Sequence, residues 1–382
     1  MSGSNGARRS GFCLRCFHPG WFAAVMGTGI VGIAFAANPG NWSQLQGGAN
    51  DAARVMAVIT AVLFVGLAGP YALRWLRYPR EALADFRNPL VGPLYATVPA
   101  GMLVAAVVAS SVGPLLVSPA VVYDLVFWLA WLGVPLTFVV GVAFVYSLMS
   151  SRSTAMEAVN GAWFIPPVAN IVVPLVLVPL MTHADPATAR LLLLTSYAFW
   201  GMGFVLFLLV LSLLHDRLVL HPLPQAAMAP SLVIGLGPVG VGALALIKIS
   251  AAGAPVFGSL APTVSLISLI AGSILWGFGL WWFAAAAVVM VRYLAQGPLP
   301  YGMGWWAFTF PLGAFTMATL ALARGWQLAY VDYLGVGLVV LLVLLWLMVA
   351  VRTVWATVTG EAWAPNRPPA AQPLPGTGPA AA

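Results

Sequence analysis

Residue types that usually carry catalysis or bind metal ions are few in this sequence, and they lie far apart. Cys13 and Cys16 have the spacing of a redox or zinc motif, but no second cysteine pair is present to complete a zinc site. No two histidines have the His-x-x-x-His spacing, and there is no Gly-x-Ser-x-Gly motif. The four histidines are His18, His183, His215 and His221. We therefore predict no catalytic site, no metal and no cofactor, and we expect the two thiols to be reduced and idle.

The composition excludes a soluble protein. Of the 382 residues, 62% are hydrophobic and only 7% are charged, whereas about 25% of the residues in an ordinary soluble domain carry a charge. The formal net charge is +7, but the basic residues are dispersed among short loops, which argues against a nucleic-acid partner. The chain is predicted to be an integral membrane protein.

Backbone N–H and C=O groups can also provide polar interactions inside a membrane. For these groups the sequence is more informative than it is for catalytic side chains. Five apolar segments each contain a helix-breaking residue, and these residues recur at intervals of about seventy positions. A broken helix is tolerated at membrane depth where the freed backbone groups find partners or line a polar cavity. The five predicted breaks are at Gly29, Pro99, Pro167, Pro238 and Pro311. They predict a ring of kinked helices around one axis, although proline and glycine are also common in membrane helices generally.

The elements that would hold these breaks are ten apolar segments, each long enough to cross a bilayer. They occupy approximately residues 20–38, 52–73, 89–111, 120–149, 163–181, 188–214, 229–250, 262–290, 305–323 and 329–352. The predicted fold class is therefore an all-α membrane protein, with five helical hairpins in a quasi-fivefold arrangement around a central pore. We expect a cytoplasmic segment over 1–19, a transport domain over 20–355 and a disordered tail rich in proline and alanine over 356–382.

The distribution of basic residues predicts the orientation. With the N-terminus in the cytoplasm, twelve arginines lie on the inner side, and only three arginines and one lysine lie on the outer side. The outer four are Arg54, Arg190, Lys248 and Arg324. This is the bias of the positive-inside rule. It predicts a multi-pass protein of the cell membrane with both termini in the cytoplasm.

The five odd-numbered segments indicate which kind of ion would pass through the predicted pore. They contain no acidic residue, and their one charge is Lys248, near the outer end of the seventh segment. Cation pathways usually place carboxylates in the membrane, so an anion is favoured. Lys248 and Arg324 would attract it at the outer mouth, although Lys248 could equally extend to the interface from a helix end. The predicted pore-lining hydroxyls are Thr28, Thr97 and Thr309.

A phenylalanine beside the break of the ninth segment is the candidate gate. A ring that projects into a narrow lumen blocks it sterically and by dewetting. The alternative for such a ring is ordinary packing or contact with lipid. Phe308, Phe310 and Phe315 all lie close to Pro311.

Several motifs resemble the tellurite-resistance/dicarboxylate transporter family, and in particular its branch with the malate permease and the sulfite efflux pump. They are Phe17–Phe22 (FHPGWF), Met26–Ile30 (MGTGI), Gly237–Pro238 and Phe308–Pro311 (FTFP). The resemblance covers roughly residues 17–355. It implies five hairpins around a pore in each protomer, a homotrimer, and passage of small anions.

The resemblance also implies that a phenylalanine of the ninth helix occludes the pore, and we assign this role to Phe310, with Phe308 and Phe315 as alternatives. For the anion, we rank a malate-like C4-dicarboxylate first, sulfite second and monovalent inorganic anions third. The absence of an acid on the odd segments favours channel-like, downhill movement. A membrane-embedded enzyme is the alternative from a different class, and it has no supporting motif.

Overall fold

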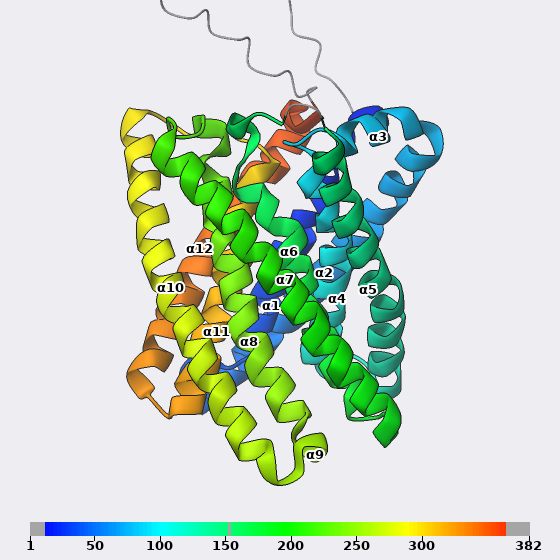
Figure 1. Cartoon of the computed structure of the whole chain (residues 1–382), viewed down its shortest axis with the longest axis vertical. Helices are drawn as coiled ribbons and strands as arrows, with labels where there is room; N and C mark the ends of the chain where they lie inside the picture. Colours follow the sequence, from blue (N-terminus) through cyan, green and yellow to red (C-terminus); the bar gives the residue numbers. More distant parts are fainter. Residues whose placement is uncertain (1–11, 152–153, 364–382) are drawn as a thin grey trace, which may run out of the picture.

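A computed structural model describes residues 12–151 and 154–363, which are almost entirely helical (Figure 1). Within these ranges, ten helical segments are long and apolar enough to cross a membrane. They coincide with the ten predicted segments, so the all-α class and the number of membrane spans are confirmed. The remaining α-helices are short: α3 (Pro79–Phe86) and α9 (Ala254–Phe257).

Burial separates the ten spans into two alternating classes. In the odd-numbered spans, 61–89% of the most apolar stretch is buried, against 17–28% in the even-numbered spans. The buried spans contain the inner helices α1 (Phe22–Ala36), α4 (Thr97–Val112), α6 (Ile165–Met181), α8 (Leu236–Ala252) and α11 (Phe310–Trp326). The exposed spans contain the outer helices α2 (Ser43–Arg77), α5 (Pro119–Ser150), α7 (Pro186–Leu220), α10 (Ala261–Gln296) and α12 (Ala329–Thr359).

Contacts among the inner helices close into a ring. Helix α1 contacts α4, α4 contacts α6, α6 contacts α8, α8 contacts α11, and α11 contacts α1 again. Each outer helix packs on the inner helix that precedes it in the chain and also on a neighbouring inner helix. The outer helix of each hairpin therefore shields the ring from the bilayer. This explains why the inner helices, which have few polar residues, are buried in the protein rather than exposed to lipid.

Each inner α-helix is preceded by a 3₁₀ helix, and this junction is where the predicted breaks mostly lie. Pro99, Pro167, Pro238 and Pro311 all occupy the first turn of their α-helix. A proline is tolerated there because the first-turn N–H groups have no partner within the helix. The break is thus a change of helix type at one end of the span rather than a kink near its middle.

Gly29 differs from the other four predicted breaks. Helix α1 is continuous from Phe22 to Ala36 and passes through Gly29 without interruption. A Cβ atom at Gly29 would lie 2.9 Å from Cγ1 of Val104 on α4. The glycine is therefore a site of close helix packing, while the proline of this repeat, Pro19, lies in the preceding 3₁₀ helix.

The five 3₁₀ helices form a second closed ring of contacts at one end of the ring of inner α-helices. They are η2 (Pro19–Trp21), η4 (Gly92–Ala96), η7 (Gly161–Phe164), η8 (Ala226–Gly235) and η10 (Met303–Phe308). Each contacts the next in this order, and η10 contacts η2. The packing is tight, since a Cβ atom at Gly161 would lie 1.8 Å from the carbonyl oxygen of Ser231.

Both described chain ends lie on the side of this 3₁₀ ring, which we call the terminal end; the other side is the opposite end (Figure 1). Trp363, the last described residue, stacks on Trp21 with ring centroids 5.0 Å apart. Helix α12 continues to Thr359 and is followed by η11 (Glu361–Trp363). The tail predicted from residue 356 is thus helical as far as residue 363, and its remainder, 364–382, lies outside the described residues.

Candidate functional site

Helix α11 has one face turned towards the outer helices. The ring of Phe315 stacks on Trp276 of α10, with centroids 6.3 Å apart, and Trp276 Nε1 donates a hydrogen bond of 2.9 Å to Thr319 Oγ1. Because an α-helix turns by about 100° per residue, Phe310, Met317 and Arg324 lie on the other side of α11. We call this side, which faces the middle of the ring, the axial face.

The axial face carries the solvent-accessible surface of an otherwise buried stretch of α11. Between Phe310 and Leu320, Met317 is the one residue classed as partly accessible, and Ala321 and Arg324 follow on the same face. Phe310, seven residues before Met317, is 6% exposed. A strip of accessible surface therefore runs inwards from the opposite end as far as Met317, and Phe310, two turns further along the same face, is buried.

Helix α8 presents Lys248 on its own axial face. A Cβ atom at Gly237 would lie 3.4 Å from Cγ2 of Val168 on α6 and 3.8 Å from Cβ of Pro311 on α11. Gly237 therefore points to where three inner helices meet. Lys248 is eleven residues further along α8, which brings it to within about 20° of the same direction, and its side chain is exposed. This geometry favours the axial role of Lys248 over a position against lipid.

The wall of the axial region between Phe310 and Lys248 is apolar. On α1, Ile30 packs where α11 has Gly313, since a Cβ atom there would lie 2.5 Å from Ile30 Cγ1. Met26 and Ile33 lie within one turn on the same side of α1 and are buried. Sequence reasoning missed this wall and Met317. The axial face of α11 could have been identified from the spacing of Phe310, Met317, Ala321 and Arg324, because residues 7, 11 and 14 apart share a helix face.

The three predicted hydroxyls do not face the axis. Thr28 Oγ1 accepts a hydrogen bond of 3.1 Å from Trp346 Nε1 on the outer helix α12. Thr97 Oγ1 donates to the carbonyl oxygens of Pro19 and Leu94, at 2.8 and 2.6 Å.

Thr309 likewise has its donor satisfied, at 2.7 Å from the carbonyl oxygen of Trp306. It packs against Gly27 of α1, where a Cβ atom would lie 2.1 Å from Thr309 Oγ1. All three hydroxyls are buried. Thr28 joins α1 to α12, and Thr97 and Thr309 bind carbonyl groups at the junctions of 3₁₀ and α-helix.

Of the three candidate phenylalanines, Phe310 is the one on the axial face. Phe315 points to α10, as described above. Phe308 packs in a cluster with Ala24, Trp306 and Val349 of α12. The structure thus separates Phe310 from both alternatives.

Arg324 lies at the opposite end of the axial face and is exposed. Its guanidinium donates hydrogen bonds to the carbonyl oxygens of Ala37 and Asn38, which follow α1. The residue therefore joins the ends of α11 and α1, and it keeps a positive charge at the opposite end, where α8 carries Lys248. A cluster of three or more His, Cys, Asp or Glu side chains that could hold a metal ion is not found among the described residues.

Sequence reasoning also missed a buried ion pair at the terminal end. Arg74 is 2% exposed, forms a salt bridge with Asp85, and donates a 3.1 Å hydrogen bond to the carbonyl oxygen of Arg15. Its third partner is the Tyr95 hydroxyl at 3.3 Å, which itself donates to the Ala82 carbonyl at 2.7 Å. The network ties the residues before α1 to α2, α3 and η4. Arg74 is near the end of a predicted span, and a sequence gives no means of telling a buried arginine there from a solvated one.

The two cysteines lie beside this network and are free thiols. Burial and a hydrogen bond with Cys13 raise the pKa of Cys16 to about 11. Cys16 is therefore protonated at neutral pH and a poor nucleophile or metal ligand.

His18 makes stability depend on pH. Its Nδ1 accepts a 3.0 Å hydrogen bond from Gly20 N, and burial lowers the pKa of His18 to about 4 although Asp85 opposes the shift. The unfolded chain binds a proton near pH 6.5 and the folded chain only near pH 4, so stability is lost as the pH falls through this window. We expect thermal unfolding of the detergent-solubilised protein to show a loss of up to about 1.4 kcal/mol per pH unit there. His18→Asn should keep the acceptor and flatten the slope; an unchanged slope would contradict this origin.

Comparison with known proteins identifies a family and several relatives of this chain. Residues 16–354 match the model of the voltage-dependent anion channel family, SLAC1. An uncharacterised transporter of Methanocaldococcus jannaschii is 34% identical, covering 91% of this chain and 95% of its own length. A sulfite efflux pump of Arthroderma otae is 29% identical, with 90% and 92% covered. A malic acid transport protein of Schizosaccharomyces pombe is 21% identical, with 95% and 83% covered.

These findings confirm the resemblance read from the sequence motifs, and they place the chain among channels and transporters rather than enzymes. The match spans all ten helices, including the inner ring and the accessible strip on α11. The chain is a member of the voltage-dependent anion channel family and serves anion transport across a membrane.

Proposed function

We propose that the protein conducts small anions through a pore along the axis of the inner ring, and that Phe310 closes this pore. The observation that carries the proposal is the accessible strip on α11, which runs from Arg324 to Met317, with the buried ring of Phe310 two turns beyond it on the same helix face. A bulky ring at the end of an accessible, apolar path is the arrangement that blocks a lumen sterically and by dewetting. The five hairpins then have quasi-fivefold symmetry around this pore.

The charges support an anion and a funnel at the outer mouth. Lys248 and Arg324 provide fixed positive charge at the opposite end, while the inner helices contribute no acidic residue. A positively lined mouth raises the local concentration of anions. We further propose that three copies assemble, each with its own pore, in a cell membrane with both chain ends in the cytoplasm.

For the substrate, we place sulfite, in its monovalent form, ahead of malate. A dianion such as malate would need donors or cations for both carboxylates, and the axial face between Phe310 and Lys248 is apolar. The sulfite efflux pump is also more similar to this chain than the malic acid transport protein. This reverses the order that the sequence motifs favoured. Malate stays the second candidate because of the latter relative.

The test is efflux from liposomes that contain the purified protein and are loaded with sulfite, malate or chloride. We expect sulfite to leave faster than malate, and efflux to persist after the pH gradient is collapsed, since movement is downhill. Faster malate efflux, or efflux abolished with the gradient, would contradict the proposal.

Lys248→Gln provides the charge test in the same liposomes. The attraction between one exposed charge and the anion is worth about 1 kcal/mol. Its loss should lower the sulfite flux about fivefold at low ionic strength. At about 1 M salt the difference should vanish, because the Debye length falls to about 3 Å. Arg190→Gln is the control, since Arg190 is exposed at the same end but belongs to the outer helix α7. Equal losses from both variants would argue against an axial lysine.

A further inference from the structure

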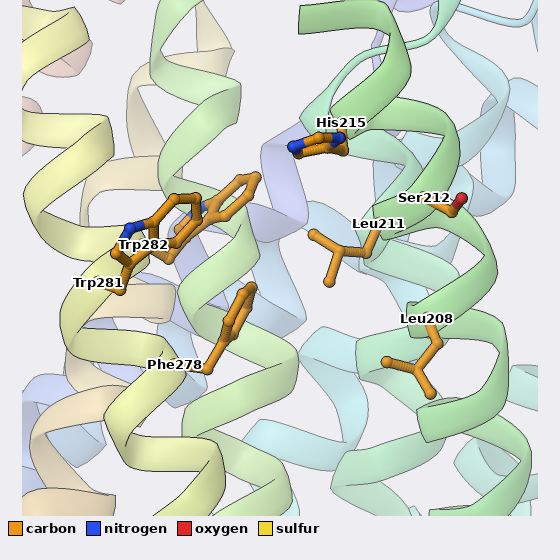
Figure 2. A pocket seen from close by; sticks show the side chains of 7 residues that line it. All are labelled: Leu208, Leu211, Ser212, His215, Phe278, Trp281 and Trp282. Atoms are coloured by element: carbon orange, nitrogen blue, oxygen red, sulfur yellow. The ribbon is translucent and has the colours of Figure 1, made fainter. Parts of the chain in front are cut away.

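A cavity of about 510 Å³ lies between the outer helices α7 and α10 (Figure 2). Its α7 wall includes Leu208, Leu211 and His215, and its α10 wall includes Phe278 and Trp281. Both helices pack on α8 from either side, which leaves a groove between them. The volume is within the range of about 300–1,000 Å³ that small-molecule sites occupy.

The groove opens to the bilayer and is closed towards the interior. Trp282 is buried, and its Nε1 donates a 2.9 Å hydrogen bond to the carbonyl oxygen of Leu232 in η8. Trp281, by contrast, is 58% exposed, and Leu208 is exposed as well. The groove therefore has no connection to the axial face, and its occupant comes from the lipid phase.

Positive charge lies beyond the groove, in the direction of the terminal end. Arg292 follows Phe278 by fourteen residues on α10, which places it on the same helix face about 21 Å along the axis. It is exposed, and no ion pair involves it among the described residues. Since α10 contains no acidic residue, this arginine has no counterion on its own helix.

A second arginine, Arg217, lies near the same end of α7, but it is about 160–180° around the helix from the groove residues Leu208 and His215 and points away from the groove. Arg217 is 5% exposed; its Nη1 donates to the carbonyl oxygen of Pro222, while its buried Nε has no hydrogen-bond partner in the described part of the chain. Arg217 and Arg292 both lie within electrostatic reach of Tyr293. The acidic residue nearby is Asp216, which is about 100° around α7 from the groove residue His215.

We propose that this groove binds one anionic phospholipid of the leaflet at the terminal end. An acyl chain lies between Leu208 and Phe278, and the phosphate group pairs with Arg292. A phosphate is the group that arginine donors bind best, and the apolar length between Phe278 and Arg292 matches a lipid that stands along the helices. A free phosphate would leave the apolar groove uncovered, so the lipid is the ligand that satisfies both parts.

Native mass spectrometry of the full-length protein, with phosphatidylglycerol or phosphatidylcholine added, tests the proposal. We expect phosphatidylglycerol to stay bound and to raise the unfolding temperature in nanodiscs more than phosphatidylcholine does. Arg292→Gln should weaken its binding about fivefold, as expected for one arginine at an anionic surface. Ser212→Trp, which fills the groove and keeps every charge, should abolish the difference between the two lipids.

Arg87→Gln is the matched control, because Arg87 is exposed at the terminal end but lies outside the groove. Equal loss of binding in Arg87→Gln and Arg292→Gln would overturn the proposal in favour of general surface charge. Unchanged binding in Ser212→Trp would show that the groove is not the site. Cross-linking of a cysteine at position 212 to a second copy of the chain would also overturn it, since another protomer would then cover the groove.

Discussion

Replacing Phe310 by alanine is expected to raise the anion current through the purified protein in a planar bilayer by an order of magnitude or more. The ring is 6% exposed and lies two turns beyond the inner end of the accessible strip, and in the proposed pore its removal opens an apolar constriction to water. A fall of about 1.4 kcal/mol in the barrier already corresponds to a tenfold increase in rate. The measurement is single-channel and macroscopic current under a sulfite gradient, with wild type and variant side by side.

Phe315→Ala is the matched control for this experiment. It removes the same ring from the same helix, but on the face that stacks on Trp276. We expect lower thermal stability and no rise in current, because the lost contacts belong to the α10–α11 interface. An increase in current from Phe315→Ala, or silence from Phe310→Ala in folded protein, would contradict the assignment of the gate.

The second large effect concerns Gly240, where α8 and α11 touch through their backbones. A Cβ atom at this position would lie 2.4 Å from the amide nitrogen of Phe315 and 2.5 Å from the carbonyl carbon of Ala314. Backbone cannot rotate away as a side chain can, so Gly240→Ala forces the two inner helices apart. We expect the free energy of unfolding to fall by about 3 kcal/mol or more.

Gly277→Ala on α10 separates this packing effect from helix propensity. Gly277 is also within a helix, but a Cβ atom there meets nothing within 4 Å. We expect it to be neutral or to stabilise by up to about 1 kcal/mol. Thermal unfolding in one detergent, with both variants compared, decides the matter. Equal stability of the two variants would show that α8 and α11 are not in backbone contact.

The ten spans, their pairing into hairpins and the inner position of the odd spans could be predicted from the sequence. Hydrophobicity and length define a membrane helix with little help from tertiary structure. The prolines at 99, 167, 238 and 311 also marked real features. Their exact meaning was less accessible, because a proline in the first turn of a helix and one in its middle have the same local sequence signal.

The residue types of the candidate site could be read from the sequence, but the directions of the side chains could not. Phe310, Lys248 and Arg324 were named from type and position, and their roles at the proposed pore stay predictions. Thr28 and Thr309 were expected to line the pore, yet their partners are Trp346 and the carbonyl of Trp306. Whether a threonine faces the axis or a neighbouring helix depends on helix rotation, and helix rotation is decided by contacts far apart in the sequence.

The positions of Lys248 and Arg324 have a consequence for the shape of the electric field at the outer mouth. They belong to α8 and α11, which are neighbours in the inner ring, while the other three inner helices carry no charge. In the proposed pore, these two charges therefore attract an anion to one side of the opening rather than to its centre. We expect the anion to follow α11 from that side towards Phe310, the proposed gate on the same helix.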